Sequence, residues 1–233
     1  MSERDALASL PKGRREEYLR EHSSLPGPRA NLELAQAAAD VGDERTFLRW
    51  LAGADEYLAL CAAIGIGRLV AAGRDDLWAR LRGAAEDGRW RVREGVAMGL
   101  QRVGDVDADR LLGEMETWLE GPPLVRRAAI AGICEPRLLR RPETARRALA
   151  IVETATASLL SESDRRAEDV RVLRQALGYC WSVAVAALPA EGVAAFVRME
   201  DLDDPDIRWI LRENRKKKRL LDVLNDRGPG TLA

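Results

Sequence analysis

Apolar residues recur along almost the whole chain with the three- and four-residue spacing of an amphipathic helix. Strict alternation of apolar and polar residues, which is typical of a half-buried strand, is missing, and runs of β-branched residues are few. Gly and Pro interrupt the helical pattern at intervals, from Pro26-Gly27-Pro28 near the start to Pro205 near the end. Because these residues stop and start helices, the pattern predicts an all-α fold of about a dozen helices.

Similar segments also recur along the chain every 33–34 residues, with one longer interval between the copies at 124–133 and 172–181. The segment RVREGVAMGLQRVG at 91–104 aligns with LALCAAIGIGRLVA at 58–71, so that Gly99 falls on Gly65. An apolar residue followed by Arg begins further copies at 124–133, 172–181 and 206–214. A fixed period of this length indicates stacked pairs of helices.

The recurring segments are predicted to be the second helix of each pair. The first helices are then expected at 44–53, 74–87, 107–120, 142–161 and 189–201. One pair cannot bury its apolar face alone, whereas a stack of pairs buries a continuous core. The repeats therefore predict a right-handed α-α superhelix of about five to six helix pairs.

The whole chain resembles bacterial HEAT-repeat proteins. The resemblance is carried by the Val-Arg or Ile-Arg starts at 92–93, 125–126 and 207–208. It implies a HEAT-like repeat solenoid over residues 29–225, preceded by an N-terminal helix and a Pro/Gly turn in residues 1–28. Residues 226–233 are expected to form a flexible C-terminal tail. The family has one fold and many unrelated partners, so the resemblance leaves the function open.

The last predicted helix, PDIRWILRENRKKKRLL at 205–221, concentrates positive charge in a chain whose formal net charge is −1. At about 100° per residue, four of its side chains fall on one stripe, opposite the apolar face: Arg208, Arg212, Arg215 and Arg219. Such a stripe can neutralise a row of phosphates. The alternative is structural, because a terminal repeat needs a polar outer face and cations are favourable near a helix C-terminus.

One Arg also occupies the same position near the start of four second helices: Arg93, Arg126, Arg174 and Arg208. In HEAT arrays the second helices line the concave surface, so this row predicts a basic groove. The alternative is that each Arg pairs with an acidic residue of the next repeat. Tyr179 and Trp181 follow Arg174 on the same helix and are candidates for stacking on bases. The alternative for both rings is packing in the core.

Two segments are similar to the bacterial alkylpurine DNA glycosylases, whose helical repeats cradle damaged DNA. RRAAI at 126–130 resembles that family's Arg-Ala-Ala-Ile run, which implies that Arg127 contacts a DNA phosphate. LRQALGY at 173–179 resembles its Ala-Ile-Gly-aromatic helix, which implies that Tyr179 faces the damaged base. The resemblance therefore implies a cradle for DNA.

The acid that supports glycosidic bond cleavage in that family is missing here. The corresponding stretch is GRWRVRE at 88–94, and Arg93 stands where the family has its catalytic Asp. A cation cannot stabilise an oxocarbenium-like centre as a carboxylate does. Glu94 is the remaining candidate acid, one residue away and about 100° further round the helix.

The residue types of metal and cofactor sites are scarce in this chain. Cys61, Cys134 and Cys180 lie in apolar helical runs without CxxC spacing, which favours buried free thiols in a reduced compartment. The one histidine, His22, is far from every cysteine in sequence. We therefore predict no metal site, no cofactor and no catalytic triad.

The pattern of the chain predicts neither a secretory signal nor a membrane span. The N-terminus has no apolar core of a signal peptide, and no apolar run reaches transmembrane length. The expected location is cytoplasmic, without membrane binding. The oligomeric state is left open.

These patterns lead to one hypothesis with two alternatives. The hypothesis is a non-catalytic HEAT-repeat scaffold whose basic concave and C-terminal surface binds nucleic acid or another polyanion, an acidic protein included. The first alternative is a DNA glycosylase-like repair enzyme that acts on alkylated bases. The second is a scaffold for protein–protein interactions alone.

Overall fold

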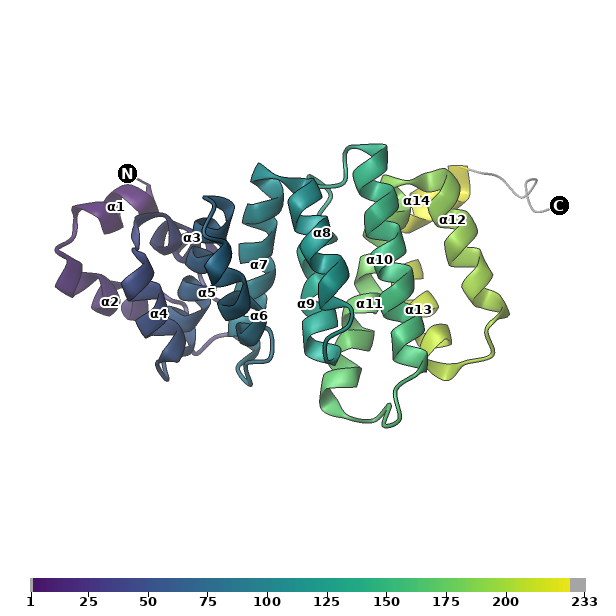
Figure 1. The fold of residues 1–233 in the computed structure, drawn as a ribbon, viewed down its shortest axis with the longest axis horizontal. Helices are drawn as coiled ribbons and strands as arrows, with labels where there is room; N and C mark the ends of the chain where they lie inside the picture. Colours follow the sequence, from purple (N-terminus) through teal and green to yellow (C-terminus); the bar gives the residue numbers. More distant parts are fainter. Residues whose placement is uncertain (1, 227–233) are drawn as a thin grey trace. The chain divides into compact units, whose positions relative to one another are not determined.

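The chain is helical throughout the part that the structure describes. A computed structural model describes residues 2–226, and over this range the chain forms fourteen α-helices, two short 3-10 helices and no strand (Figure 1). The all-α prediction is therefore confirmed. The chain divides into two compact units, Met1–Asp107 and Ala108–Ala233.

The first unit is built around one buried helix, α5. Its helices are α1 (Glu3–Ser9), α2 (Lys12–Glu21), α3 (Leu32–Val41), α4 (Glu44–Ala52), α5 (Glu56–Ala71), the 3-10 turn η1 (Asp75–Leu77), α6 (Trp78–Ala84) and α7 (Trp90–Val106). Helix α5 contacts α2, α3, α4, α6 and α7. A helix that is apolar on all sides belongs in a core, and all eleven residues from Tyr57 to Gly67 are buried.

Short polar side chains cap the starts of α1, α3, α4 and α5 in this unit. Asp43 accepts a hydrogen bond from the backbone N–H of Thr46 at 2.9 Å and so caps α4. Asp55 accepts two, from Tyr57 and Leu58, both at 3.0 Å, and caps α5. Such caps satisfy N–H groups that have no partner inside the helix, which is why these starts can be predicted from sequence.

Helices α5 and α7 approach so closely that their backbones touch. A Cβ atom added to Gly99 would lie 2.7 Å from the carbonyl oxygen of Ala63, and one added to Gly95 would lie 2.7 Å from that of Leu60. A Cβ on Gly67 would overlap the backbone of Gly99. The glycines of the repeated segments therefore serve helix packing, and GIGRLVAAG at 65–73 is helix rather than a phosphate-binding loop up to Ala71.

The second unit also has one helix at its centre, α11. Its helices are α8 (Ala108–Trp118), α9 (Pro123–Ile133), α10 (Pro142–Leu160), α11 (Glu168–Ala187), α12 (Pro189–Arg198), the 3-10 turn η2 (Met199–Asp201), α13 (Pro205–Arg215) and α14 (Lys218–Asp226). Helix α11 contacts α9, α10, α12, α13 and α14. Four helices of this unit begin with Pro at their first position, where the missing N–H costs nothing.

The prediction of one continuous helix at 205–221 is wrong, because this stretch forms two helices, α13 and α14. Ile207, Ile210 and Leu211 lie on the buried face of α13, but Leu220 would point to the opposite side of a continuous helix. The break around Lys216 lets α14 turn and bury Leu220 completely against the unit. Burial of one leucine side chain contributes about 2 kcal/mol, which favours the bent path.

The other predicted helices lie where the pattern placed them. The five expected first helices correspond to α4, to η1 with α6, to α8, to α10, and to α12 with η2. Residues 1–28 contain two helices, α1 and α2, where one was expected. Of the predicted tail at 226–233, Asp226 ends α14, and the rest lies outside the described residues.

Candidate functional site: a cationic aromatic patch on the second unit

The four arginines of the predicted row, Arg93, Arg126, Arg174 and Arg208, each contact other residues of their own unit. In the first unit, Arg93 donates to the carbonyl oxygens of Asp87 at 2.6 Å and Gly88 at 3.1 Å. In the second unit, Arg126 donates to the carbonyl of Gly121, also at 2.6 Å. Both arginines reach back to the carbonyl five residues before them. They therefore tie the start of their helix to the preceding turn.

The other contacts of the row are with carboxylates. Arg126 also pairs with Glu162 at 2.6 Å, Arg174 pairs with Asp206 at 2.5 Å, and Arg208 pairs with Asp203. Arg127, which the glycosylase resemblance assigned to DNA phosphate, is half-buried and has a partner within the fold as well. Only Arg126 and Arg174 pair with an acidic residue about one repeat further along the chain, as the structural alternative predicts. The contacts given above for Arg93 and Arg208 are with the turn just before their own helix.

Arg174 belongs to a compact ionic cluster at the start of α13. Arg165 pairs with Asp204 and Asp206, each at 2.6 Å, and Arg174 lies over the ring of Trp209 at 5.0 Å. Asp204 also caps α13 through the N–H groups of residues 206 and 207. The Arg165 guanidinium, helped by these N–H groups, lowers the pKa of Asp204 to about 2. The cluster therefore stabilises the fold while Asp204 is ionised.

The pKa of Asp204 predicts a pH-dependent loss of stability. A carboxyl whose pKa is lowered by folding stabilises the fold fully above its unfolded value of 3.8, and this contribution is lost as the pH falls toward about 2. We expect Asp204→Asn, which keeps a capping oxygen, to lower the free energy of unfolding by about 2 kcal/mol at pH 7. The difference from the wild type should shrink below pH 4.

Urea unfolding of both proteins from pH 7 to pH 3 measures this difference. Asp222→Asn is the matched control, since Asp222 is exposed on α14, and it should leave stability unchanged. A constant gap between Asp204→Asn and the wild type over this range would contradict the role of the charge.

Tyr179 and Trp181, two residues apart on α11, have opposite environments. Trp181 is 1% exposed, and its indole N–H donates to the hydroxyl of Thr156 at 3.0 Å. It therefore belongs to the core and has no exposed face for stacking on a ligand, which corrects its place among the predicted binding residues. Tyr179 is 41% exposed.

Cations from α14 and its preceding turn lie against the Tyr179 ring. The ammonium of Lys217 is 5.7 Å from the ring centre, and the guanidinium carbon of Arg219 is 5.2 Å from it. Within residues 2–226, neither cation forms a close ion pair with a carboxylate, although Lys217, after Lys216 and Arg212, helps to lower the pKa of Glu213. We call these three residues the Tyr179 patch. Figure 1 shows α11 beside α13 and α14, the elements that bring the patch together.

The predicted Arg stripe is divided between different contacts. Arg208 pairs with Asp203, and Arg215 pairs with Glu200 and lies over the ring of Phe196. Arg212 is exposed, with a 3.9 Å contact to Glu213, whereas Arg219 is on the next helix. The stripe is therefore not one surface. Tyr179 and Arg219 were both predicted as binding residues, but the sequence did not predict that they lie together or that Lys217 joins them, because the bend after α13 creates these contacts.

Glu94, the remaining candidate acid, is held in the first unit by an ion pair. Its carboxylate accepts a hydrogen bond from Arg91 at 2.9 Å. The guanidinium of Arg91 also donates to the carbonyl of Pro28 at 2.9 Å, and it lies 4.4 Å from the ring centre of Trp90. Arg91 therefore holds Pro28, in the loop before α3, against the start of α7.

Comparison with protein-family models, curated proteins and solved structures finds no match to this chain. The function is therefore argued from the site alone. In the described part of the chain, no three His, Cys, Asp or Glu residues are placed to hold a metal ion. No helix in residues 2–226 is both long and apolar enough to cross a bilayer. Cys61, Cys134 and Cys180 are buried and free, as predicted.

Proposed function

We propose that this chain is a non-catalytic scaffold that binds nucleic acid, or another polyanion, at the Tyr179 patch. One observation carries the proposal: a half-exposed aromatic ring has two cations 5.7 and 5.2 Å from its centre, and neither cation forms an ion pair with a carboxylate in residues 2–226. The rest of the fold is consistent with a helical-repeat protein. We infer a right-handed HEAT-like superhelix from the 33-residue period and from helices that begin where it predicts.

Aromatic rings beside cations provide both of the contacts that bind single-stranded nucleic acid. Lysine and arginine neutralise phosphates, and an exposed ring stacks on bases whatever the sequence. The two cations are already placed on the ring, so little side-chain entropy is lost on binding. Arg212, on α13, and Lys218, on α14, are also exposed. We therefore expect salt-dependent binding with little sequence preference.

The test is fluorescence anisotropy with a labelled single-stranded oligonucleotide and its duplex, measured over a salt series. We expect Lys217→Ala/Arg219→Ala to weaken binding at least tenfold at about 50 mM salt and to reduce the slope of log K against log salt by about 2. Tyr179→Ala should weaken single-strand binding more than duplex binding, because only unpaired bases offer a free face.

The control removes the same charge from the same unit. Arg146→Ala/Arg147→Ala takes away two exposed arginines of α10, which pair with Glu191 and Glu116, and it should leave binding unchanged. An equal loss of affinity in both double variants would mean that binding depends only on the net charge of the chain, not on the Tyr179 patch. Absence of DNA binding by the folded wild type, together with salt-sensitive binding of polyglutamate, would instead favour an acidic protein as the partner.

A further inference from the structure

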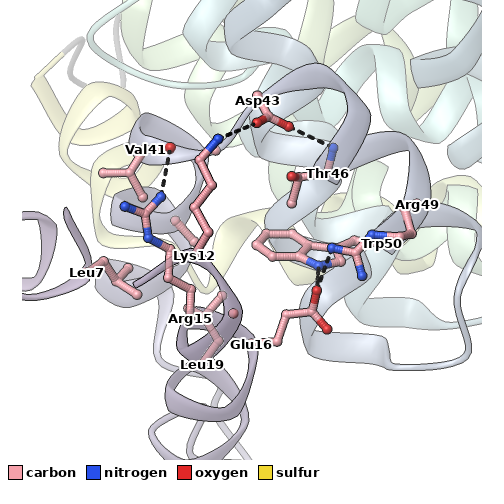
Figure 2. Close-up of a pocket in the computed structure, with 13 residues that line it drawn as sticks. Leu7, Lys12, Arg15, Glu16, Leu19, Val41, Asp43, Thr46, Arg49 and Trp50 are labelled. Carbon is pink, nitrogen blue, oxygen red and sulfur yellow. Dashed lines mark hydrogen bonds and ion pairs between the residues drawn. The ribbon is translucent and has the colours of Figure 1, made fainter. Parts of the chain in front are cut away.

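The first unit contains a hollow between α1, α2, α3 and α4 that the sequence does not reveal. Its volume is about 430 Å³, which is within the range of small-molecule sites (Figure 2). Leu7, Leu19, Ala38 and the ring of Trp50 form an apolar floor, and all four are buried. The charged residues that line the hollow are Lys12, Arg15, Glu16, Asp43 and Arg49. A hollow with an apolar floor and several charged groups can hold an amphiphilic ligand.

Arg15 gives this hollow a fixed positive charge. The guanidinium is half-buried and donates to three carbonyl oxygens, those of Ala8 at 3.2 Å, Leu10 at 3.3 Å and Val41 at 3.5 Å. These carbonyls lie at the C-terminal ends of α1 and α3, whose dipoles hold the guanidinium in place. In the described chain, Arg15 has no carboxylate partner, so its formal charge is not neutralised.

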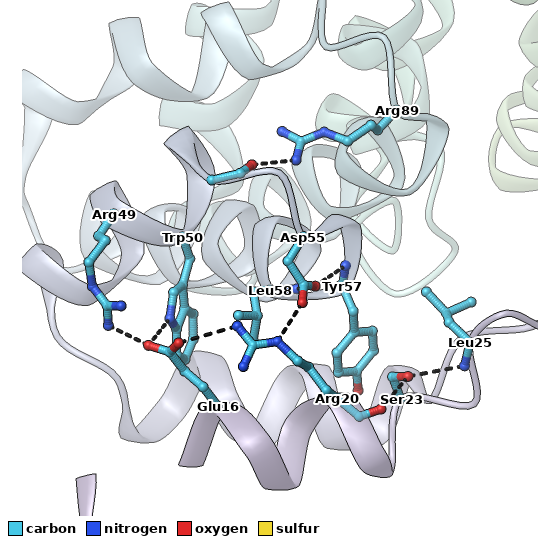
Figure 3. Close-up of polar contacts among 11 residues, drawn as sticks. Glu16, Arg20, Ser23, Leu25, Arg49, Trp50, Asp55, Tyr57, Leu58 and Arg89 are labelled. Atoms are coloured by element: carbon cyan, nitrogen blue, oxygen red, sulfur yellow. Dashed lines mark hydrogen bonds and ion pairs between the residues drawn. The ribbon is translucent and has the colours of Figure 1, made fainter. Parts of the chain in front are cut away.

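The two carboxylates of the hollow already have donors. Glu16 accepts the indole N–H of Trp50 at 2.9 Å and pairs with Arg49 and Arg20 (Figure 3). The hydrogen bond from Trp50, with the two arginines, lowers the pKa of Glu16. The carboxylate of Asp43 caps α4, and its hydrogen bonds with Thr46 lower its pKa to about 2. Both groups are therefore ionised at neutral pH, and most of their accepting capacity is in use.

The hydrogen-bond donors of the hollow, in contrast, can still donate to a bound ligand. The ammonium of Lys12 has three N–H groups, and its one contact in residues 2–226 is with Asp43 at 3.3 Å. Its side chain is 82% exposed, so it can turn toward a bound group at little cost. Arg49 has five N–H groups and contacts Glu16 alone in the described chain. Figure 2 shows Lys12 and Arg49 on either side of Trp50. Spare donors around a positive centre favour an anion.

We propose that this hollow binds a small organic anion with a flat aromatic body and one carboxylate or sulfonate group. The acidic group is bound by Lys12, in the positive field of Arg15. The aromatic body packs on the half-buried Val41 and on the accessible part of the Trp50 indole, above the buried Leu7 and Leu19. The plane of the indole is fixed by its hydrogen bond to Glu16. The site lies in the first unit and is independent of the Tyr179 patch.

The experiment uses 8-anilinonaphthalene-1-sulfonate, a fluorescent anion of this class, with the full chain in its folded state. We expect one saturable site per chain. In a competition assay, 2-naphthoate should displace the probe, whereas the neutral 2-naphthalenemethanol should not. Lys12→Gln should weaken probe binding at least fivefold, and Lys218→Gln, an exposed lysine of the second unit, should leave it unchanged.

A second variant tests the place of binding without relying on charge. Gly13 lines the hollow, and a Cβ there meets no atom within 4 Å, so Gly13→Phe can fold with its ring at the hollow wall. We expect this variant to bind the probe at least tenfold more weakly. Gly83→Phe is the matched control, because Gly83 is also a helical glycine with no atom within 4 Å of an added Cβ.

Three results would overturn the proposal. The first is no saturable binding by the folded wild type. The second is displacement by the neutral alcohol as efficiently as by 2-naphthoate, which would remove the requirement for an anion. The third is equal binding by Gly13→Phe and Gly83→Phe, which would place the probe elsewhere.

Discussion

Gly67→Ala is expected to destabilise the chain by more than ~3 kcal/mol, although alanine is the better helix former. The added Cβ would overlap the Cα, carbonyl carbon and carbonyl oxygen of Gly99 on α7. These are backbone atoms, so no change of rotamer can make room. Helices α5 and α7, which form the most extensive helix–helix contact among the described residues, would have to move apart. This movement would open cavities between their other buried residues.

Thermal and urea unfolding followed by circular dichroism measure this effect. Gly83→Ala makes the same substitution in α6 of the same unit, where a Cβ meets no atom within 4 Å. It should be neutral or stabilise the chain by up to about 1 kcal/mol. The proposed backbone contact would be contradicted if Gly67→Ala were as stable as Gly83→Ala.

Asn214→Ala should lower the free energy of unfolding by about 3 kcal/mol, the second largest effect that we expect. Asn214 is completely buried at the end of α13. Its side-chain oxygen accepts the backbone N–H of Ser182 at 2.8 Å, and its amide donates to the carbonyls of Leu177 at 2.9 Å and Ile210 at 2.8 Å. Alanine would leave these polar groups of α11 and α13 without their partner and would leave a small cavity.

Hydrogen exchange gives a local test of the same interaction. The amide of Ser182 should exchange faster in Asn214→Ala than in the wild type, because its acceptor is removed. Asn225→Ala changes an exposed asparagine of α14 and serves as the control, with an expected change within about 0.5 kcal/mol. Unchanged exchange at Ser182 in a destabilised Asn214→Ala protein would place the loss of stability elsewhere.

The helix positions could be predicted because the forces that set them act locally. Asp43, Asp55 and Asp204 each precede their helix and accept its first N–H groups. Proline begins α9, α10, α12 and α13. These signals lie within a few residues of the boundary that they determine, so they can be read without knowledge of the neighbours in space.

The binding surface could not be predicted in the same way. The helical periodicity makes Tyr179 and Trp181 equally good candidates for a binding surface. Contacts with α10 and α12, however, bury Trp181. Lys217 and Arg219 contact Tyr179 only because the chain bends after α13. The partners of Arg126 and Arg174 lie 36 and 32 residues away in sequence. Nothing in the charge pattern distinguishes an arginine with such a partner from a free one.

The sequence by itself determined that the chain is all-α, where most of its helices begin, and that its glycines recur with the repeats, but it did not give the start of α14 or the two separate helices α1 and α2. Apolar periodicity, capping residues and proline act over one or two helical turns, so each is complete within a short segment. The tertiary structure alone decided which cations are free, which aromatic ring is exposed, and where a hollow lies between α1 and α4. These properties depend on the packing of helices that are tens of residues apart, and burial and ion pairing are decided only by that packing.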